Sequence, residues 1–557
     1  MAPFTVSGNI VNITDRRIFS GTITVENGCI QQIEVLGNEP DPGLPYLLPG
    51  FIDSHVHIES SMLVPSEFAR LAVVHGTVGT ISDPHEIANV CGMAGVEYMI
   101  ENGQTVPFKF CFGAPSCVPA TSFETAGATL NAADVKTLLE RPEVRYLSEM
   151  MNFPGVLNGD EEVLSKIAAA HELGKPVDGH APGLRGDAAR RYISAGISTD
   201  HECFTREEAF EKIQYGMKIL IREGSAAKNF EALIDLLQDY PDQIMFCSDD
   251  KHPDSLVSGH IDQLCARAVA KGINVFHVLQ AACINPVLHY RMPVGLLREG
   301  DPADFILVTD LQDFKVQQTY INGIRVAEKG SSLIQAGKAA VLNHFDCDTK
   351  QTADFLFPLT KFGHTDAENM EQVYVVEALD GQLITHKLKE PISSFTFSDN
   401  NLQANTDKDL LHMVVVNRYH PAPIAKCFVK NFGLKTGAIA SSVAHDSHNI
   451  IAVGTSPASL CQAVNRIIES RGGVSAVRPT ASGWDEVVVQ LPVAGLMSTK
   501  DGYAVAREYS AVDALAKEMG STLTAPFMTL SFMALLVIPH LKLSDLGLFD
   551  GDEFRLI

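Results

Sequence analysis

Basic residues are scarce in this sequence, and their scarcity narrows the range of partners. The 557 residues include 43 Lys and Arg against 67 Asp and Glu, which gives a formal net charge of -24 at pH 7. Such a surface repels a phosphate backbone, so we expect no nucleic-acid polymer as a partner. A neutral small molecule remains compatible with this charge.

Segments that would enter or cross a membrane are also missing. Residues 1–20 contain polar and charged residues throughout and no continuous apolar core, so we expect no secretory signal. The most apolar late run, residues 526–539, is too short for a bilayer and predicts a buried helix. The 11 Cys residues include no CxxC pair, which favours reduced thiols. The sequence therefore predicts a cytoplasmic protein without a membrane partner.

The chain is too long for one hydrophobic core, and its pattern changes along its length. Residues 1–48 and 291–345 both show short alternating strands with Asn-Gly hairpin signals, at 27–28 and 322–323. We expect these two segments to pack together as one small β-sandwich. Residues 350–557 mix strand and helix patterns and predict a separate α+β domain.

Between these segments, residues 49–290 repeat a short apolar run followed by a helical segment. Eight such units in about 240 residues fit a (β/α)8 barrel. The predicted fold class is therefore α/β: a (β/α)8 barrel, a β-sandwich from the segments flanking it, and a C-terminal α+β domain. The eight expected strands are residues 51–57, 77–83, 107–112, 144–149, 176–180, 197–201, 217–221 and 243–249.

Polar side chains stand at the ends of most of these runs, where a barrel places its active site. Side chains alternate along a strand, so Asp53, His55 and His57 share one face of the first. Solvated strand ends would also be polar, but they would not so regularly be His and carboxylate. The groups that can bind a metal or move a proton are His55, His57, Asp83, His85, Glu149, His180, His201, Glu223 and Asp249.

Six of these groups could serve as metal ligands. A single catalytic zinc needs only three protein ligands and a water, so six ligands are more than one zinc requires. We therefore expect two divalent cations bridged by a carboxylate. For each residue alone a solvated strand end is the ordinary alternative, and agreement among six positions favours the metal site. The first metal would be held by His55, His57 and Asp249, the second by His180 and His201, with Glu149 as the bridge.

Two cations in such a site would activate water. A hydroxide shared by both is a strong nucleophile at neutral pH, because each metal lowers the pKa of its bound water. Asp249 would touch this hydroxide and accept its proton, which predicts hydrolytic attack on an electrophilic carbon. Asp250 follows directly, so register alone selects between the two acids.

The second strand end adds two further candidates. His85 and Glu86 would lie at the same mouth without being needed as ligands, so one of them could carry a proton or anchor the substrate. The alternative is helix capping, with Asp83 as N-cap, Pro84 at the first helical position and Glu86 completing a capping box. For Asp83 the capping role is favoured, and for His85 and Glu86 both interpretations stay open.

The predicted C-terminal domain carries one polar cluster, at residues 445–449. The spacing of His445 and His448 fits no metal motif. It favours a turn with solvated polar side chains, and a lid or substrate-facing loop is the alternative.

The sequence resembles the amidohydrolase superfamily at residues 49–57 and 300–304. Within it, the sequence is similar to the adenine deaminase family over essentially the whole chain. The motifs that carry this closer resemblance are residues 57–62, 83–89, 148–152, 178–183, 199–202, 248–252 and 445–449.

The resemblance implies hydrolysis of adenine to hypoxanthine and ammonia, as in purine salvage. It implies a binuclear centre of manganese or iron, with zinc as a further candidate, on the six ligands already named. Glu149 stands where many relatives have a carbamylated Lys. We expect Asp249, His85 and Glu86 to be catalytic, adenine to be the small-molecule partner, and the protein to be a homo-oligomer, a dimer.

Two other functions compete with this one. Another amidohydrolase, acting on a cyclic amide, would usually have a bridging Lys and lack the long C-terminal domain. A non-catalytic interaction protein built on a degenerate barrel would be expected to have lost ligands, and here all six are present.

Overall fold

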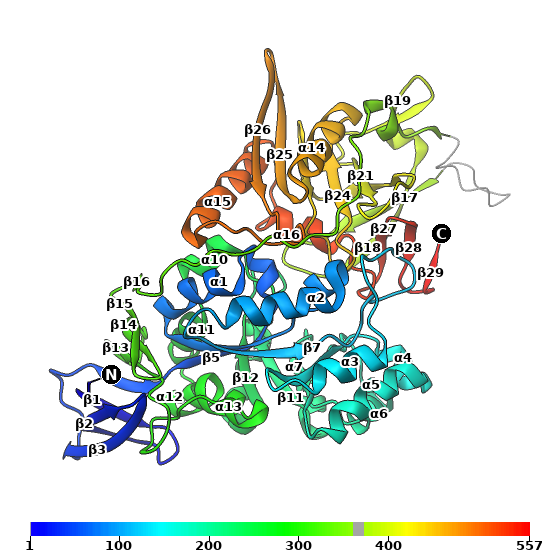
Figure 1. Ribbon diagram of the computed structural model, residues 1–557. Coiled ribbons are helices and arrows are strands. Elements are labelled where there is room, and N and C mark those ends of the chain that lie inside the picture. The colour runs from blue at the N-terminus through cyan, green and yellow to red at the C-terminus, as the bar shows by residue number, and fades with distance from the viewer. Residues whose placement is uncertain (1, 360–371) are drawn as a thin grey trace.

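The computed structural model describes residues 2–359 and 372–557. A barrel forms the lower part of the molecule, a small sheet lies at its side, and the C-terminal part covers its top (Figure 1). None of the helices in the described ranges has both the length and the apolar character needed to cross a bilayer.

Eight parallel strands form the barrel, and each of the eight predicted runs overlaps one of them. Strands β5 to β9 pair in order as one sheet and β10 to β12 as a second. Parallel bridges from Val177 to Ile197 and from Val56 to Asp249 join the two sheets on both sides, which closes the barrel. The strands are β5 (Phe51–Val56), β6 (Thr77–Ser82), β7 (Lys109–Ala114), β8 (Val144–Met150), β9 (Val177–Gly179), β10 (Thr199–Asp200), β11 (Lys218–Arg222) and β12 (Ile244–Cys247).

Helices follow the strands and cover the outside of the barrel (Figure 1). Strands β5, β6 and β12 are consequently buried on both faces, as strands of a parallel sheet are. The helices are α1 (Pro65–Ala72), α2 (His85–Gly103), α3 (Ala132–Leu139), α4 (Phe153–Asn158), α5 (Glu161–Glu172), α6 (Gly186–Ser194), α7 (Arg206–Gln214), α8 (Phe230–Leu233), α9 (Leu236–Asp239), α10 (Pro253–Ser258), α11 (Ile261–Ala270), α12 (Val275–Leu279) and α13 (Asn285–Tyr290).

The two segments flanking the barrel pair with each other in one continuous eight-stranded sheet. Leu48 pairs with Ile306, which joins the N-terminal strands to the later ones. Both Asn-Gly pairs, at 27–28 and 322–323, have positive φ and make the predicted hairpin turns. The strand order is β16 (Ser331–Ser332), β15 (Ile324–Glu328), β14 (Val316–Ile321), β13 (Phe305–Val308), β4 (Tyr46–Pro49), β1 (Phe4–Asn12), β2 (Arg17–Glu26) and β3 (Cys29–Gly37).

The C-terminal part is built on a second eight-stranded sheet with helices packed against it (Figure 1). Its strand order is β18 (Thr385–Pro391), β17 (Gln372–Ala378), β22 (Ala425–Lys430), β21 (Leu411–Val416), β24 (Ile450–Gly454), β23 (Ala438–Ser441), β25 (Gly473–Thr480) and β26 (Gly483–Gln490). Its main helices are α14 (Pro457–Ser470), α15 (Gly502–Glu518) and α16 (Pro526–Phe532), and a small sheet of β27 (Leu541–Ser544), β28 (Gly547–Asp550) and β29 (Arg555–Leu556) ends the chain.

The apolar run at 526–539 is buried as predicted, but its predicted helical extent was wrong. Helix α16 ends at Phe532, and the following residues form turns. Lys542 Nζ donates to the carbonyl oxygen of Phe532 at 2.9 Å and to that of Leu383 at 2.6 Å. A carbonyl at the helix end is thus satisfied by a side chain instead of a further helical turn.

Candidate metal centre and active site

The six predicted metal ligands come together at the C-terminal ends of the barrel strands, and all six side chains are buried. This convergence follows from the fold, because parallel strands bring their C-terminal ends to one mouth. His55 is the penultimate residue of β5 and His57 follows the strand. Glu149 lies on β8, His180 and His201 directly follow β9 and β10, and Asp249 lies two residues beyond β12.

His55, His57 and Asp249 form the first group. The Nε2 atoms of the two imidazoles are 3.2 Å apart. Asp249 Oδ1 lies 3.5 Å from His55 Nε2 and 3.3 Å from His57 Nε2. Three potential ligand atoms therefore converge on one point, with the spacing that a shared cation needs.

Glu149 connects this group to a second one. Its Oε1 lies 3.4 Å from His57 Nε2. Its Oε2 lies 2.9 Å from His180 Nδ1 and 3.2 Å from His201 Nε2. One carboxylate thus offers one oxygen to each group, which is the placement that a bridge between two cations requires.

The sequence interpretation missed Glu202, which follows His201. Glu202 Oε1 lies 3.4 Å from His201 Nε2 and 3.6 Å from His180 Nδ1, so these three residues also form a potential metal group. Glu202 Oε1 also accepts a hydrogen bond from Arg222 Nη1 at 2.5 Å.

Arg222 lines the site, whereas Glu223, the group expected at that strand end, does not. Glu223 Oε1 pairs with Arg267 at 2.7 Å. Side chains alternate between the two faces of β11, and this alternation was the signal that could have separated Arg222 from Glu223.

Arg222 also donates to Asp249 Oδ2. Burial alone would raise the pKa of Asp249, but the Arg222 guanidinium and the nearby imidazoles hold it well below its usual range.

Two buried polar networks hold the ligands in place. Asp200 accepts from Lys212 Nζ at 2.5 Å, and Lys212 also donates to the carbonyl of Ala181 at 2.7 Å. Because Asp200 precedes His201 and Ala181 follows His180, this network fixes both ligand-bearing loops.

The second network starts at Asp53, which lies on β5 together with His55. Asp53 accepts from Ser248 N at 2.9 Å, from Ser248 Oγ at 2.5 Å and from His260 Nε2 at 2.8 Å. It thereby joins β5 to the residue before Asp249.

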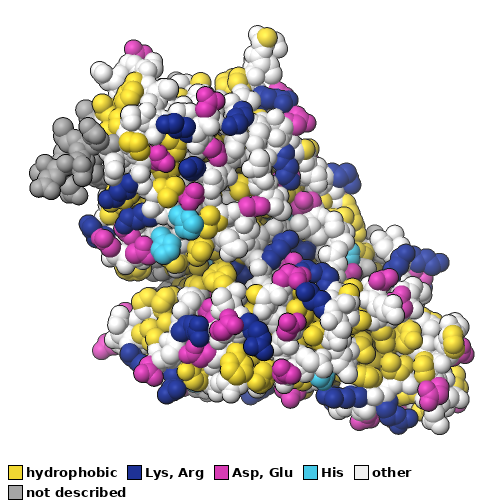
Figure 2. Space-filling view, turned by 180° about the vertical axis from the view of Figure 1, so that it is seen from behind, with side chains coloured by type: hydrophobic (Ala, Val, Ile, Leu, Met, Phe, Trp, Pro, Cys, Tyr) yellow, Lys and Arg dark blue, Asp and Glu magenta, His cyan; other side chains and the backbone are white. Residues whose placement is uncertain are grey.

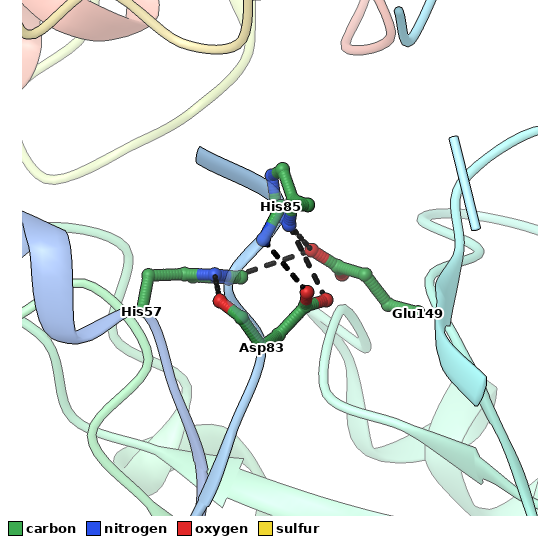
Figure 3. Close-up of side chains that lie close together, drawn as sticks. All are labelled: His57, Asp83, His85 and Glu149. Carbon is green, nitrogen blue, oxygen red and sulfur yellow. Dashed lines mark hydrogen bonds and ion pairs between the residues drawn. The ribbon is translucent and has the colours of Figure 1, made fainter. Parts of the chain in front are cut away.

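At the second strand end the capping prediction was only partly right. Helix α2 begins at His85 with Pro84 as N-cap, and Asp83 Oδ1 accepts from His85 N at 3.1 Å. Glu86 forms no capping box, because its carboxylate is bonded elsewhere. Figure 3 shows the His85 ring beside Asp83 and Glu149, with His85 Nδ1 3.6 Å from Glu149 Oε1.

The Glu86 carboxylate binds the C-terminal part of the chain. His445 Nδ1 and His448 Nε2 both hydrogen-bond to it, and both histidines are buried. The favoured prediction of a solvated turn at residues 445–449 was therefore wrong. The local sequence of residues 445–449 is typical of a turn. These residues enter the site only because the C-terminal part of the chain folds over the barrel mouth.

These residues line one partly open pocket, whose empty space of about 310 Å³ includes solvent at its mouth. Both candidate acids, Asp249 and Asp250, line it, and Asp249 forms a potential metal group with His55 and His57. The other lining residues are His57, His85, Glu86, Glu149, Met151, His180, His201, Glu202, Arg222, Leu383, His445, Asp446 and Leu535.

Comparison with known proteins agrees with this geometry. Residues 46–326 match the model of the amidohydrolase family, and residues 382–555 match that of the adenine deaminase C-terminal domain. The barrel and its strand-end ligands, together with the first match, define the chain as an amidohydrolase.

The adenine deaminase of Sulfurovum sp. (strain NBC37-1) is 55% identical over 99% of both chains. That of Salinibacter ruber is 53% identical over 100% of this chain and 99% of its own. The chain belongs to the adenine deaminase family. Among solved structures, N-acetyl-D-glucosamine-6-phosphate deacetylase from Mycobacterium smegmatis matches with a TM-score of 0.45 and 15% identity, over 58% of this chain and 100% of its own.

Proposed function

We propose that the protein hydrolyses adenine to hypoxanthine and ammonia. The observation that carries the proposal is the Glu149 carboxylate, which offers one oxygen to each of two buried imidazole groups in one cavity. Membership of the adenine deaminase family, with relatives matched over nearly their whole length, supports adenine as the substrate.

The residues present fit two divalent cations. Their ligand atoms are imidazole nitrogens and carboxylate oxygens without a thiolate, a set that suits manganese, iron or zinc. We propose manganese or iron, with zinc as a further candidate. The cations when bound would supply Lewis-acid activation of water. The proposed ligands are His55, His57, Glu149, His180, His201 and Asp249.

The roles of the chain's own groups follow from their positions. Asp249 Oδ1 faces the two imidazoles of the first group, while Oδ2 is bonded to Arg222, so Oδ1 is the oxygen placed to accept a proton from the attacking water. His85 Nε2 has no hydrogen-bond partner within the described ranges and lines the cavity, so it is placed to protonate a ring nitrogen. Glu86 Oε1 lies 3.5 Å from the same nitrogen, where its negative charge favours the protonated imidazole. The proton taken from water leaves with ammonia.

Several finer features belong to the same proposal. All 11 cysteines are unpaired, which supports a cytoplasmic location and a role in purine salvage there.

We also propose a homodimer. Hydrophobic side chains gather over the small sheet (Figure 2), and its edge strand β3 exposes Val35 by 54% and Leu36 by 58%. The proposed domains are residues 1–48 with 291–345, 49–290 and 350–557.

The test is conversion of adenine by the full chain supplied with manganese, followed by the change in ultraviolet absorbance and by ammonia release. We expect one hypoxanthine and one ammonia for each adenine consumed. Hydrolysis of hydantoin or dihydroorotate with no change in adenine would instead assign the site to a cyclic amide.

A further inference from the structure

His445, in the C-terminal part of the chain, has one ring nitrogen that no protein group satisfies. The residue is 3% exposed and lines the cavity. Its Nδ1 hydrogen-bonds to Glu86 Oε1, whereas its Nε2 has no hydrogen-bond partner among the residues that the structure describes. Asp250 Oδ1 lies 3.8 Å from this nitrogen, beyond hydrogen-bond distance, and already accepts from Ser60 Oγ. A buried polar atom of this kind is an open contact for a ligand.

Both nitrogens of the His445 ring carry a proton at neutral pH. Burial alone would raise the pKa of Glu86, but the imidazoles of His445 and His85 hold it well below its usual range. An ionised carboxylate only accepts hydrogen bonds, so His445 Nδ1 is the donor in the bond between them. Burial alone would lower the pKa of His445, but the Glu86 carboxylate raises it to about 9. The unpartnered Nε2 is therefore a hydrogen-bond donor.

The His445 ring is held in place by its own part of the chain. His445 N donates to Ser531 Oγ at 3.3 Å, and the ring centroid lies 5.5 Å from that of Phe532. Both of these residues belong to α16. Two residues beyond His445, the carbonyl of Ser447 accepts from Tyr419 Oη at 2.6 Å. A donor held in this way has the fixed position that recognition of a small ligand needs.

The groups on this side of the cavity follow one another in a row that leads away from the proposed metal ligands. His85 Nδ1 lies 3.6 Å from Glu149 Oε1 (Figure 3), and His85 Nε2 lies 3.5 Å from Glu86 Oε1. The same Glu86 oxygen accepts from His445 Nδ1. The order is therefore Glu149, His85, Glu86 and His445.

The edge atoms of adenine stand in a matching order. Around the six-membered ring, the reacting carbon C6 is followed by N1, C2 and N3. With C6 beside Glu149 and N1 at His85, the C2–H comes opposite the Glu86 carboxylate, where it makes a weak contact. N3, which is a hydrogen-bond acceptor, then comes opposite His445. N7 lies on the other side of C6 and points away from these groups.

We propose that His445 donates a hydrogen bond from Nε2 to N3 of the purine ring and is a specificity-determining residue of the site. This inference rests on the proposed deamination of adenine. A base with carbon at this position would leave the Nε2–H buried without an acceptor, and the site would discriminate against it.

Two analogues of adenine test this contact. In 3-deazaadenine a C–H replaces N3, and in 7-deazaadenine a C–H replaces N7 while N3 is kept. The inhibition constant of each analogue is measured from initial rates of adenine deamination by the manganese-loaded full chain. Because each variant is compared with wild type on both analogues, any effect that the two analogues share cancels.

Two substitutions separate the two bonds of the His445 ring. In His445→Asn the amide nitrogen takes the place of Nδ1, so the bond to Glu86 is kept and the donor to the base is lost. We expect its inhibition constant to rise by about tenfold or more for 7-deazaadenine and by less than about threefold for 3-deazaadenine. In His445→Gln the amide nitrogen takes the place of Nε2, so the preference for 7-deazaadenine should stay within about threefold of wild type.

The matched control is His448→Ala. His448 also hydrogen-bonds to Glu86, but both of its ring nitrogens are already bonded within the protein, so it has no donor for the base. Its substitution disturbs Glu86 and should shift both inhibition constants by the same factor. Metal content and melting temperature are measured on every sample.

Equal shifts for the two analogues in His445→Asn would overturn the proposal, because they would show that His445 acts only through Glu86. A loss confined to 3-deazaadenine would overturn it as well, since the contact would then be to N7. A wild-type protein that releases no ammonia from adenine would contradict the proposed function itself. That failure shows before any analogue is added, so the two failures are distinguishable.

Discussion

Glu86, on helix α2 of the barrel, accepts a hydrogen bond from His448 Nε2 in the C-terminal part. The other ring nitrogen of His448, Nδ1, accepts from Ala444 N at 3.2 Å, so the single proton of the ring lies on Nε2. Burial lowers the pKa of His448, which agrees with a neutral ring. A neutral imidazole with a fixed tautomer thus joins the two halves of the site.

The substitution His448→Ala should weaken both stability and catalysis. It leaves one Glu86 oxygen and the Ala444 N–H buried without partners, at a cost of about 1–3 kcal/mol each in the free energy of unfolding. Denaturant unfolding and kcat on adenine measure the effect. The control is His386→Ala in the same part of the chain, where the side chain is 52% exposed and a change below about 0.5 kcal/mol is expected. Equal stability of the two variants would contradict this role of His448.

Glu149→Gln tests the bridge. The amide keeps the shape of the side chain and removes the negative charge that would hold two cations close together, so we expect loss of both metal and activity. Metal is counted by elemental analysis of the purified protein, with the exposed Glu140→Gln as control. Full metal content with full activity in Glu149→Gln would remove Glu149 from the bridge.

Asp249→Asn tests the proposed base. Asparagine retains an oxygen for the metal but cannot take up a proton, so most metal should remain while kcat falls by about 100-fold or more. Asp250→Asn is the matched comparison, since Asp250 instead accepts from Ser60 Oγ at 2.5 Å, and a smaller loss of kcat is expected. Near wild-type turnover of Asp249→Asn would exclude it as the base.

Lys542 gives a prediction for pH dependence. Burial lowers the pKa of Lys542 from 10.5 to about 7, and its amine donates to two backbone carbonyls. Between pH 7 and 10.5 the unfolded chain holds more protons at this site than the folded one, so this group makes stability rise with pH in that window. Wild type should therefore gain melting temperature relative to Lys542→Met from pH 7 to 9. Parallel profiles of the two proteins would contradict the lowered pKa.

The barrel and its ligand group were predictable because their signals are local and periodic. Each apolar run marks a strand, and five of the eight strand ends carry the six candidate ligands, so His55, Glu149 and Asp249 could be placed without knowing how the helices pack. The Asn-Gly turns likewise fixed both hairpins of the small sheet.

The contribution of the C-terminal part could not be predicted in the same way. His445 and Asp446 reach the cavity only because a second sheet folds over the barrel mouth, and no local pattern encodes that docking. Arg222 and Glu202 were overlooked for another reason. Each stands next to a residue that already fits the strand-end pattern, Glu223 or His201, and only their contacts with Asp249 and His201 show that they belong to the site.

The central claim is hydrolytic deamination over two metals, and titration of metal-free protein with manganese tests it most directly. Ammonia release from adenine is measured on the same samples in which bound metal is counted. The account predicts no ammonia from the metal-free chain and a rate that rises to a plateau at about two manganese per chain. Full activity without metal, or two bound metals without ammonia from adenine, would contradict it.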